Sequence, residues 1–260
     1  MNLHFYKYHG AGNDFIMIDS NESMLQENDD ELIRQLCDRH TGIGADGLII
    51  LKEHDEVDFE MLYFNSDGKP GTMCGNGGRC TVAFAHSKGY IGDETTFLAN
   101  NTIHHAYIQK NNYIALEMDD VLSIKSLPDG FVLDTGSLHF VRFLSNIENV
   151  DISTEGRKIR SDTRFGAEGV NVNFCQMVSD DSLKIITYER GVENETLSCG
   201  TGAVASALAF CYSKPDGNYL IHVQAKGGNL EVAFKKRNNS YSQIWLKGPA
   251  TFVFDGNYTV

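Results

Sequence analysis

The pattern of apolar and polar positions predicts a chain made mostly of strands. In the first half, apolar runs bounded by glycine, asparagine or aspartate predict strands at residues 3–8, 15–19, 48–51, 59–64, 95–99, 103–109 and 113–118. The Asn111-Asn112 pair is expected to form the hairpin turn that joins the last two. One amphipathic helix follows Asp29, a capping residue, with its apolar stripe at Leu32, Ile33, Leu36 and Cys37.

A second kind of helix is predicted where small apolar residues follow one another. The run at residues 81–88, which contains Val82 to Ala85, leaves little polar face, and the run from Ala203 to Tyr212 is similar. A helix that is apolar all round has to be buried, so we expect each to be wrapped by its own sheet. A cysteine followed by glycines opens each one, at residues 74–77 and 199–202.

The chain repeats itself. At the offset that carries Cys74 onto Cys199 (199 − 74 = 125), Tyr63 falls on Tyr188 and the strand at 95–99 falls on residues 220–224. The segment at 105–110 falls on 230–235, and the upstream segments 44–47 and 12–13 match 166–169 and 136–137 at nearly the same offset. This period is too long for a solenoid repeat and indicates two domains of one fold. We place the boundary between residues 119 and 128, where the strand pattern lapses, giving halves 1–119 and 120–249.

Composition and charge narrow the class of partner. A length of 260 residues suits two domains, and 42% hydrophobic with 22% charged residues is typical of a globular protein. The net charge of −13 repels phosphate backbones, so nucleic acid is not an expected partner. No run approaches the ~20 apolar residues of a membrane span, and the first ten residues lack an apolar signal core. We expect a cytoplasmic protein without a membrane partner.

Six cysteines occur, and their surroundings differ. Without a secretion signal a disulfide framework is not expected, and the absence of a C-x-x-C pair argues against a zinc site, so no metal is expected. Buried apolar thiols are the interpretation for Cys37, Cys80, Cys175 and Cys211. Cys74 and Cys199 differ because glycines follow them at the start of a helix, where N–H groups and the helix dipole favour a thiolate.

Two such helix starts facing one substrate permit a specific reaction. A carboxylate between them would accept N–H groups from both ends, and the same groups stabilise the enolate-like carbanion beside it. One thiolate removes the α-proton from one face and the other thiol returns a proton from the opposite face. The α-carbon is inverted, with no cofactor.

This chemistry requires the two thiols to have separate pKa values. His139 and Glu189 are the candidates that tune them. Asn65 and Arg190 hold equivalent positions in the two halves, and the Arg190 guanidinium could bind a second carboxylate in a bidentate manner.

At this point the sequence resembles the diaminopimelate epimerases, cofactor-independent enzymes of lysine and peptidoglycan precursor synthesis. The match extends over nearly the whole chain. Its motifs are His9-Gly10-Ala11-Gly12-Asn13-Asp14-Phe15, Gly42-Ile43-Gly44-Ala45-Asp46, Phe64-Asn65-Ser66-Asp67-Gly68, Cys74-Gly75-Asn76-Gly77, Tyr188-Glu189-Arg190-Gly191 and Ser198-Cys199-Gly200-Thr201-Gly202.

The resemblance implies an α/β (α+β) fold of two pseudo-symmetric domains. Each is a strongly curved, mostly antiparallel sheet around a central helix, and the final strand at 250–260 returns to the first domain. Cys74 and Cys199 match the catalytic pair, and His139 with Glu189 matches groups that tune it. The residues that match the substrate-binding positions fall into two groups: Gly75, Asn76, Gly200 and Thr201 at the reacting carboxylate, and Asn13, Asn65, Asn171, Glu189 and Arg190 at the distal amino-acid end.

Two departures from the family pattern fall on the distal end. Gly136-Ser137-Leu138-His139 stands where Gly-Asn-Pro-His is usual, and Gly47 stands where some members have glutamine. Asn13, Asn65 and Asn171 also suit simple turn positions.

Three functions therefore stay open. The leading one is interconversion of LL- and meso-2,6-diaminopimelate. The alternatives are a related racemase of histidine or of proline derivatives, and a binding domain without activity. Oligomeric state is also open, with a homodimer among the alternatives.

Overall fold

The computed structural model of the protein describes residues 2–23, 25, 29–71, 73–110 and 113–259. The chain forms two compact units, residues 1–116 with 248–260 and residues 117–247. The turn predicted at Asn111-Asn112 lies outside the described residues. No helix in the described segments is long and apolar enough to cross a bilayer.

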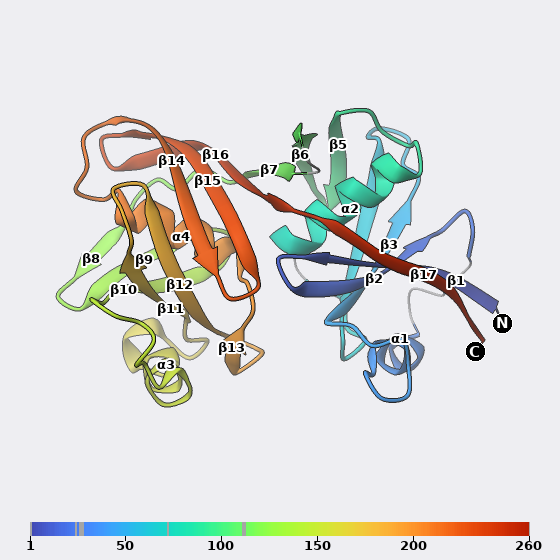
Figure 1. Ribbon diagram of the computed structural model, residues 1–260, viewed down its shortest axis with the longest axis horizontal. Helices are drawn as coiled ribbons and strands as arrows, with labels where there is room; N and C mark the ends of the chain where they lie inside the picture. The colour runs from blue at the N-terminus through green and yellow to red at the C-terminus, as the bar shows by residue number, and fades with distance from the viewer. Residues whose placement is uncertain (1, 24, 26–28, 72, 111–112, 260) are drawn as a thin grey trace. The chain divides into compact units, whose positions relative to one another are not determined.

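The first unit holds eight strands and two helices among its described residues (Figure 1). In chain order they are β1 (Asn2–Gly10), β2 (Asn13–Asp19), α1 (Asp30–Cys37), β3 (Gly47–Lys52), β4 (Phe59–Asn65), α2 (Gly75–Ser87), β5 (Glu94–Ala99), β6 (Thr102–Ile108), β7 (Tyr113–Met118) and, from the end of the chain, β17 (Thr251–Thr259).

The second unit repeats the plan with small additions. Its elements are β8 (Lys125–Leu127), β9 (Gly130–Asp134), β10 (Leu138–Phe143), α3 (Ile152–Arg160), a short 3₁₀ turn (Thr163–Phe165), β11 (Asn171–Met177), β12 (Ser182–Glu189), β13 (Asn194–Thr196), α4 (Gly200–Phe210), β14 (Gly217–Ala225), β15 (Gly228–Arg237) and β16 (Ser240–Pro249).

Strand pairing shows the repeat directly. In the first unit β1 pairs antiparallel with β2, β2 parallel with β3, β3 antiparallel with β4, and β4 parallel with β5, which continues antiparallel to β6 and β7. The succession from β9 to β16 is the same, with β10–β11 and β12–β14 as the parallel pairs. The predicted fold class, a mixed α/β fold dominated by sheet and duplicated within the chain, is confirmed. β17 adds an antiparallel partner to β1, running from Asn2↔Thr259 to His9↔Thr251.

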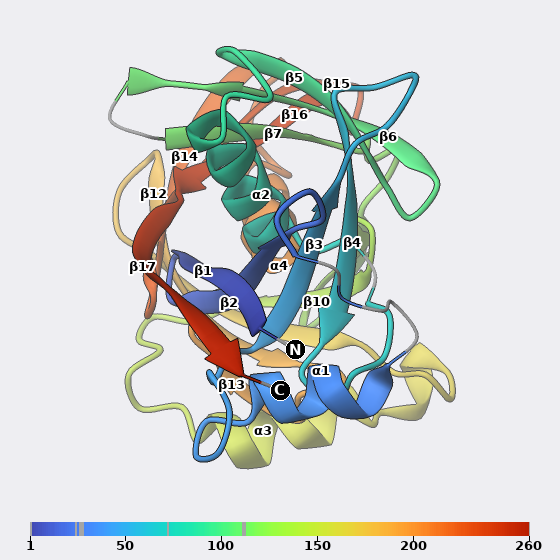
Figure 2. The same ribbon diagram turned by 90° about the vertical axis from the view of Figure 1, so that its right-hand side faces the viewer.

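Each repeat carries one buried helix against its own strands. α2 packs on β1 to β4 and on β6, and Figure 2 shows it between β1–β2 and β5–β7. Ten residues of α2 are buried. α4 packs on β9 to β12 and on β14 and β15, with every residue from Gly202 to Ala209 buried. The expectation of a wrapped, small-residue helix in each half is therefore confirmed.

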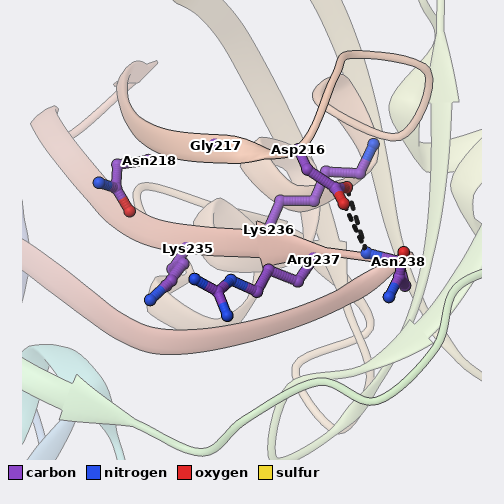
Figure 3. Close-up of a pocket in the computed structure, with 7 residues that line it drawn as sticks. All are labelled: Asp216, Gly217, Asn218, Lys235, Lys236, Arg237 and Asn238. Carbon is purple, nitrogen blue, oxygen red and sulfur yellow. Dashed lines mark hydrogen bonds between the residues drawn. The ribbon is translucent and has the colours of Figure 1, made fainter.

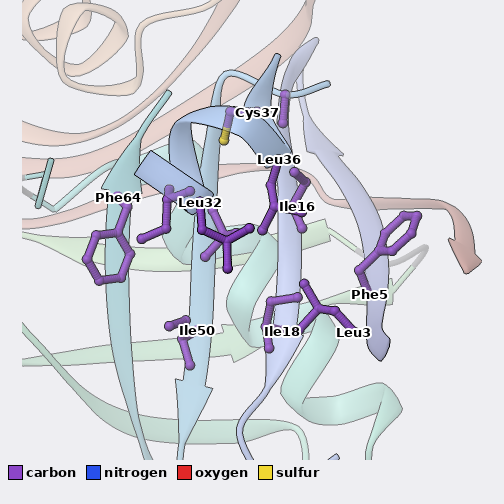
Figure 4. Packing of buried hydrophobic residues seen from close by; sticks show 12 residues of the cluster. Leu3, Phe5, Ile16, Ile18, Leu32, Leu36, Cys37, Ile50 and Phe64 are labelled. Atoms are coloured by element: carbon purple, nitrogen blue, oxygen red, sulfur yellow. The ribbon is translucent and has the colours of Figure 1, made fainter. Parts of the chain in front are cut away.

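The amphipathic helix α1 closes a separate apolar cluster. As predicted, the Asp29 side chain caps it by accepting from the Leu32 backbone N–H, and its apolar stripe is buried. Figure 4 shows this stripe packed against residues from β1 to β4. The cluster contains Leu3, Phe5, Ile16, Ile18, Leu32, Ile33, Leu36, Cys37, Ala45, Leu48, Ile50 and Phe64.

Two features differ from the predicted pattern. α2 begins at Gly75 rather than at residue 81, so the glycine-rich segment is the first turns of the helix and not a loop before it. Glycine disfavours a helix by about 1 kcal/mol relative to alanine, and here the surrounding sheet overrides that preference. The short strand β8 also lies within the stretch where the strand pattern lapses. Three residues are too few to show an alternating pattern.

Candidate active site

Cys74 is the residue that precedes α2. It has extended backbone angles (φ −104°, ψ 118°), and its carbonyl accepts the first helical hydrogen bond, from Gly78 N–H at 2.7 Å. The first N–H groups of a helix have no acceptor inside it and carry the positive end of its dipole. The Cys74 side chain therefore lies where an anion is favoured, and it is partly exposed.

A network of amides surrounds the Cys74 thiol. Cys74 Sγ donates to Asn13 Oδ1 at 3.6 Å, and Asn76 Nδ2 donates to the same oxygen at 3.2 Å. Asn13 comes from the start of β2, so the β1–β2 turn and the start of α2 meet at the cysteine. The structure thus brings together three of the five residues predicted in this half, and Gly75 is beside them in the chain.

Carboxylates hold Asn13 in place. Its Nδ2 donates to Asp46 Oδ2 at 2.7 Å, and Arg39 bridges Asp46 and Asp14 with two contacts of 2.6 Å. Lys7 pairs with Asp14 at 2.7 Å. The hydrogen bonds and charges of Arg39 and Lys7 outweigh burial and lower the pKa of Asp14 to about 2. Asn13 therefore presents a fixed acceptor toward the thiol.

Asn65, the fifth predicted residue of this half, ends β4 with an exposed side chain. Its backbone N–H donates to Lys69 O at 2.9 Å and its carbonyl accepts from Gly68 N–H, closing the predicted turn. The side chain forms no hydrogen bond within the described part of the chain and is available to a ligand.

Cys199 occupies the equivalent position before α4. Its backbone angles are nearly those of Cys74 (φ −117°, ψ 112°), but its side chain is buried, with 6% exposure. Cys199 Sγ accepts from Gly202 N–H at 3.4 Å and lies 3.5 Å from Thr201 Oγ1. The Gly202 N–H stabilises the thiolate form of Cys199 when that form is present.

Thr201 links Cys199 to His139. Its hydroxyl lies 2.9 Å from His139 Nε2, and Ser137 Oγ lies 3.0 Å from the same nitrogen. On the other side of the ring, Asn173 Nδ2 donates to His139 Nδ1 at 2.9 Å. Nδ1 is thus an acceptor, and the ring proton of the neutral imidazole is on Nε2, directed at the two hydroxyls.

His139 is fully buried, and its charge state follows from that burial. Loss of solvation, with a further contribution from the Arg190 charge, lowers the pKa of His139 to about 3. The imidazole is neutral at physiological pH and acts on Thr201 by hydrogen bonding rather than as a cation. Asn173, whose Oδ1 accepts from Thr187 Oγ1 at 2.9 Å, holds it in that form.

The residues of the second unit that were predicted for the distal end lie at the start of β11 and at the end of β12. Asn171 is buried, and its side chain donates to Ser137 Oγ and Leu138 O while accepting from Arg190 N–H at 2.8 Å. Its polar atoms are thus used to hold the chain that carries Arg190. The Arg190 guanidinium contacts Glu168 at 3.4 Å, a carboxylate that is 87% exposed. Glu189, at the end of β12, is partly buried beside it.

The other four cysteines are buried. Loss of solvation raises the pKa of Cys37 to about 12, that of Cys175 to about 12, and that of Cys211 to about 11. The pKa of Cys80 is also raised, for the same reason. These thiols stay protonated at neutral pH, which agrees with their interpretation as core residues.

A surface hollow of about 390 Å³ lies elsewhere in the second unit, between β14 and β15 (Figure 3). Its lining includes Lys235, Lys236 and Arg237, and the Asn238 backbone N–H donates to both oxygens of Asp216 at 3.1 Å. Lys236 Nζ contacts Cys211 O, at the end of α4 opposite to Cys199. The hollow is therefore separate from the cysteine chemistry. Within the described ranges, no group of three or more His, Cys, Asp or Glu side chains could hold a metal ion.

Several residues of these networks were not predicted. Three of them are buried polar residues, namely Asn173, Thr187 and Arg79. The one sequence signal for such a residue is its position as a polar residue within an apolar run. Asp46 lies in a motif that was recognised, but Arg39 lies outside every named motif, and its pairing with Asp46 and Asp14 was not predicted.

A comparison with known protein families agrees with the interpretation of the sequence motifs. The model of the family described as diaminopimelate epimerase matches residues 5–120 and 131–253. The diaminopimelate epimerase of Flavobacterium psychrophilum is 48% identical over 254 residues, covering 97% of this chain and 99% of that protein. The enzyme of the same name from Chlorobaculum tepidum is 41% identical, covering 96% of this chain and 99% of its own.

Solved structures share the fold at low sequence identity. A phenazine biosynthesis protein of the PhzF family from Bacillus anthracis has a TM-score of 0.78 at 13% identity, with all of both chains covered. A hydroxyproline epimerase from Agrobacterium vitis has a TM-score of 0.65 at 12% identity, over 98% of this chain and 92% of its own. With its motifs, its duplicated fold and full-length relatives of high identity, this chain belongs to the diaminopimelate epimerase family and is an isomerase.

Proposed function

We propose that the protein interconverts LL- and meso-2,6-diaminopimelate, without a cofactor, by proton transfer at two cysteines. The observation that carries the proposal is a structural arrangement that occurs twice, at Cys74 and at Cys199. In each case the cysteine directly precedes a buried helix whose first residue is glycine. The relatives that cover the whole chain bear the name of this activity.

Each helix start supplies what one face of the reaction needs. The N–H groups at Gly75 and Gly200 belong to the first turns of α2 and α4, where they stabilise the substrate carboxylate and the charge that develops on it. One cysteine, as the thiolate, takes the α-proton, and its electron pair becomes the new S–H bond. The other thiol gives its proton to the opposite face of the carbanion, which leaves the second cysteine as the thiolate.

The distal end of the substrate is a second amino-acid group, for which charged and amide groups are required. Arg190, which is partly exposed and pairs with the exposed Glu168 among the described residues, supports binding of a second carboxylate. Asn65 offers an amide to the same end. Asn171 acts indirectly in this proposal, since it holds the backbone of Arg190.

The test is proton exchange in deuterated water, followed by ¹H NMR, with LL-diaminopimelate as substrate. Cys74→Ala and Cys199→Ala should each lose epimer formation by at least about 10²–10⁴-fold, the usual contribution of a positioned acid or base. Both should still bind substrate. Cys80→Ala, which removes a buried thiol of the same helix α2, should retain turnover.

A substrate panel separates the alternatives. Turnover of histidine or a proline derivative, with none of diaminopimelate, would overturn the proposed substrate while leaving the two-cysteine chemistry intact. Full turnover by Cys74→Ala would overturn the chemistry itself. A role in lysine and peptidoglycan precursor synthesis, in the cytoplasm, follows if the substrate is diaminopimelate.

A further inference from the structure

Arg79 is a buried cation that the proposed chemistry does not use. It lies in the second turn of α2 and its exposure is 0%, which makes it the largest fully buried side chain described. Arginine is rarely buried without an anionic partner, because removing the guanidinium from water costs several kcal/mol. Its position therefore requires an explanation.

Among the described residues, Arg79 donates hydrogen bonds to neutral oxygens. Nη1 donates to Gly75 O at 3.2 Å and Nη2 to Asn76 Oδ1 at 2.8 Å, while Nε has no partner. No carboxylate within the described ranges forms an ion pair with it. The guanidinium also lies near the positive end of the α2 dipole, which adds to its cost.

The side chain folds back toward the residues that follow Cys74. Arg79 donates hydrogen bonds to Gly75 O and to Asn76 Oδ1. The Asn76 Nδ2 group in turn donates to Asn13 Oδ1. Burial lowers the pKa of Arg79, and the anionic forms of Cys80, Cys74 and Tyr113 each oppose that effect. The positive charge of Arg79 and the Cys74 thiolate thus stabilise each other.

The equivalent position in the second unit carries no charge. At the repeat offset of 125 (79 + 125 = 204) Arg79 falls on Val204, which is buried in α4. The buried polar group near Cys199 is instead the neutral His139, which hydrogen-bonds to Thr201, and Thr201 in turn contacts Cys199 Sγ. The two half-sites therefore share a backbone geometry and differ in charge.

We propose that Arg79 is a positioning residue whose buried charge stabilises the thiolate form of Cys74 when the thiol loses its proton, and whose hydrogen bonds orient Asn76 beside it. The titratable groups that act on Arg79 besides Cys74 are Cys80 on α2 and Tyr113 on β7, and Asp14 on β2 acts on Cys80. Cys80 stays protonated through burial and supplies no counter-charge. The proposal rests on the proposed role of Cys74, but its test requires no turnover.

The test measures alkylation of Cys74 by iodoacetamide between pH 6 and 10, quantified for the Cys74 peptide by mass spectrometry. In Arg79→Met the charge is lost at similar length, so the Cys74 pKa should rise by at least about one unit, with an alkylation rate at neutral pH about tenfold lower. The acid limb of kcat/KM should move to higher pH. Cys199 alkylation should change by much less.

The matched control is Thr81→Val, which removes a buried hydroxyl of the same helix whose hydrogen bond, among the described residues, is to Gly77 O. It should leave Cys74 alkylation unchanged. A folded Arg79→Met protein with wild-type Cys74 reactivity overturns the proposal. So does a Thr81→Val protein with the same loss, since the effect would then come from helix packing.

Arg79→Lys decides the matter if Arg79→Met does not fold. The lysine keeps the charge and loses the forked hydrogen bonds. Cys74 alkylation within about threefold of wild type, less than half a pKa unit, supports the charge role. A tenfold fall in a stably folded Arg79→Lys protein contradicts it. Diaminopimelate turnover is measured separately, so failure of the proposed function would be visible on its own.

Discussion

At the scale of single residues, the two half-sites tolerate change differently although their motifs match. A Cβ at Gly202 would lie 2.5 Å from Asn173 Oδ1 and 3.2 Å from Cys199 Sγ. Asn173 cannot yield, because Thr187 and His139 hold its amide on both sides. At the equivalent Gly77 the close contacts of a Cβ would be the flexible ends of Ile49 and Met61, at 3.1 and 3.2 Å, with Cys74 Cβ at an ordinary contact distance of 3.5 Å.

We therefore expect Gly202→Ala to be much more harmful than Gly77→Ala. Overpacking against the fixed amide should cost about 1–3 kcal/mol of unfolding free energy, and displacement of Cys199 should lower kcat/KM by about 10²-fold. Gly77→Ala should lose less than about 1 kcal/mol, since side chains with free rotamers can move aside. Urea denaturation and steady-state kinetics measure both; equal effects would contradict this account.

The two cysteines and the asparagine side chains near Cys74 could be predicted from the sequence. The buried polar residues that contact their neighbours, Arg79 and Asn173, could not. Cys74 and Cys199 are marked by glycines that are their neighbours in the chain. Both residues act through contacts with other turns and strands. Arg79 stands out because it is buried without an ion pair, and Asn173 because its buried amide is fixed in one orientation. Neither property has a local signal.

At the scale of elements, the C-terminal end of α4 depends on a side chain from a strand. The last turn of α4 has no basic residue of its own. Lys236 of β15, 3% exposed, donates to Cys211 O at 3.0 Å, Tyr212 O at 2.6 Å and Lys214 O at 2.5 Å. An ammonium group at this end also complements the negative end of the helix dipole.

Lys236→Met should lower the unfolding free energy by about 1–3 kcal/mol, because buried carbonyls lose their donor. Lys235→Met is the matched control, since it removes the same charge from the adjacent position, where the lysine donates no hydrogen bond within the described ranges. Its effect should stay within about 0.5 kcal/mol. Thermal unfolding measures both, and similar losses would show that net charge, rather than the helix end, is responsible.

Elements were predictable where the local pattern and the tertiary structure agree. The strand at 113–118 and the helix capped by Asp29 were both predicted and have the expected bounds or cap. The start of α2 was not, since three glycines among its first four residues argue against a helix, and only the enclosing sheet makes it one.

At the scale of the whole molecule, the two units are built on one plan, yet only the first takes in a strand from the far end of the chain. β17 pairs with β1 along its length. Its aromatic side chains extend the contact, with ring centroids of Phe254 and Phe5 5.8 Å apart and those of Phe252 and Tyr8 5.5 Å apart. The first unit therefore depends on residues that the second unit does not need.

Truncation after Ala250 should destabilise the first unit selectively. Without β17, strand β1 becomes an edge, and its amides on that side lose their acceptors. Hydrogen exchange should show loss of protection in β1 and retained protection in β14 and β15, which pair within the second unit. Equal loss in both units would contradict the separate dependence inferred from the pairing.

The same strand sets an order of events while the chain is being made. β1 leaves the ribosome before residues 117–247, whereas β17, the strand that completes its sheet, leaves after them. Residues 117–247 are contiguous and can fold as soon as they emerge. The sheet next to Cys74 is therefore completed only after the whole second unit has been synthesised, and until then its β1 edge has no partner.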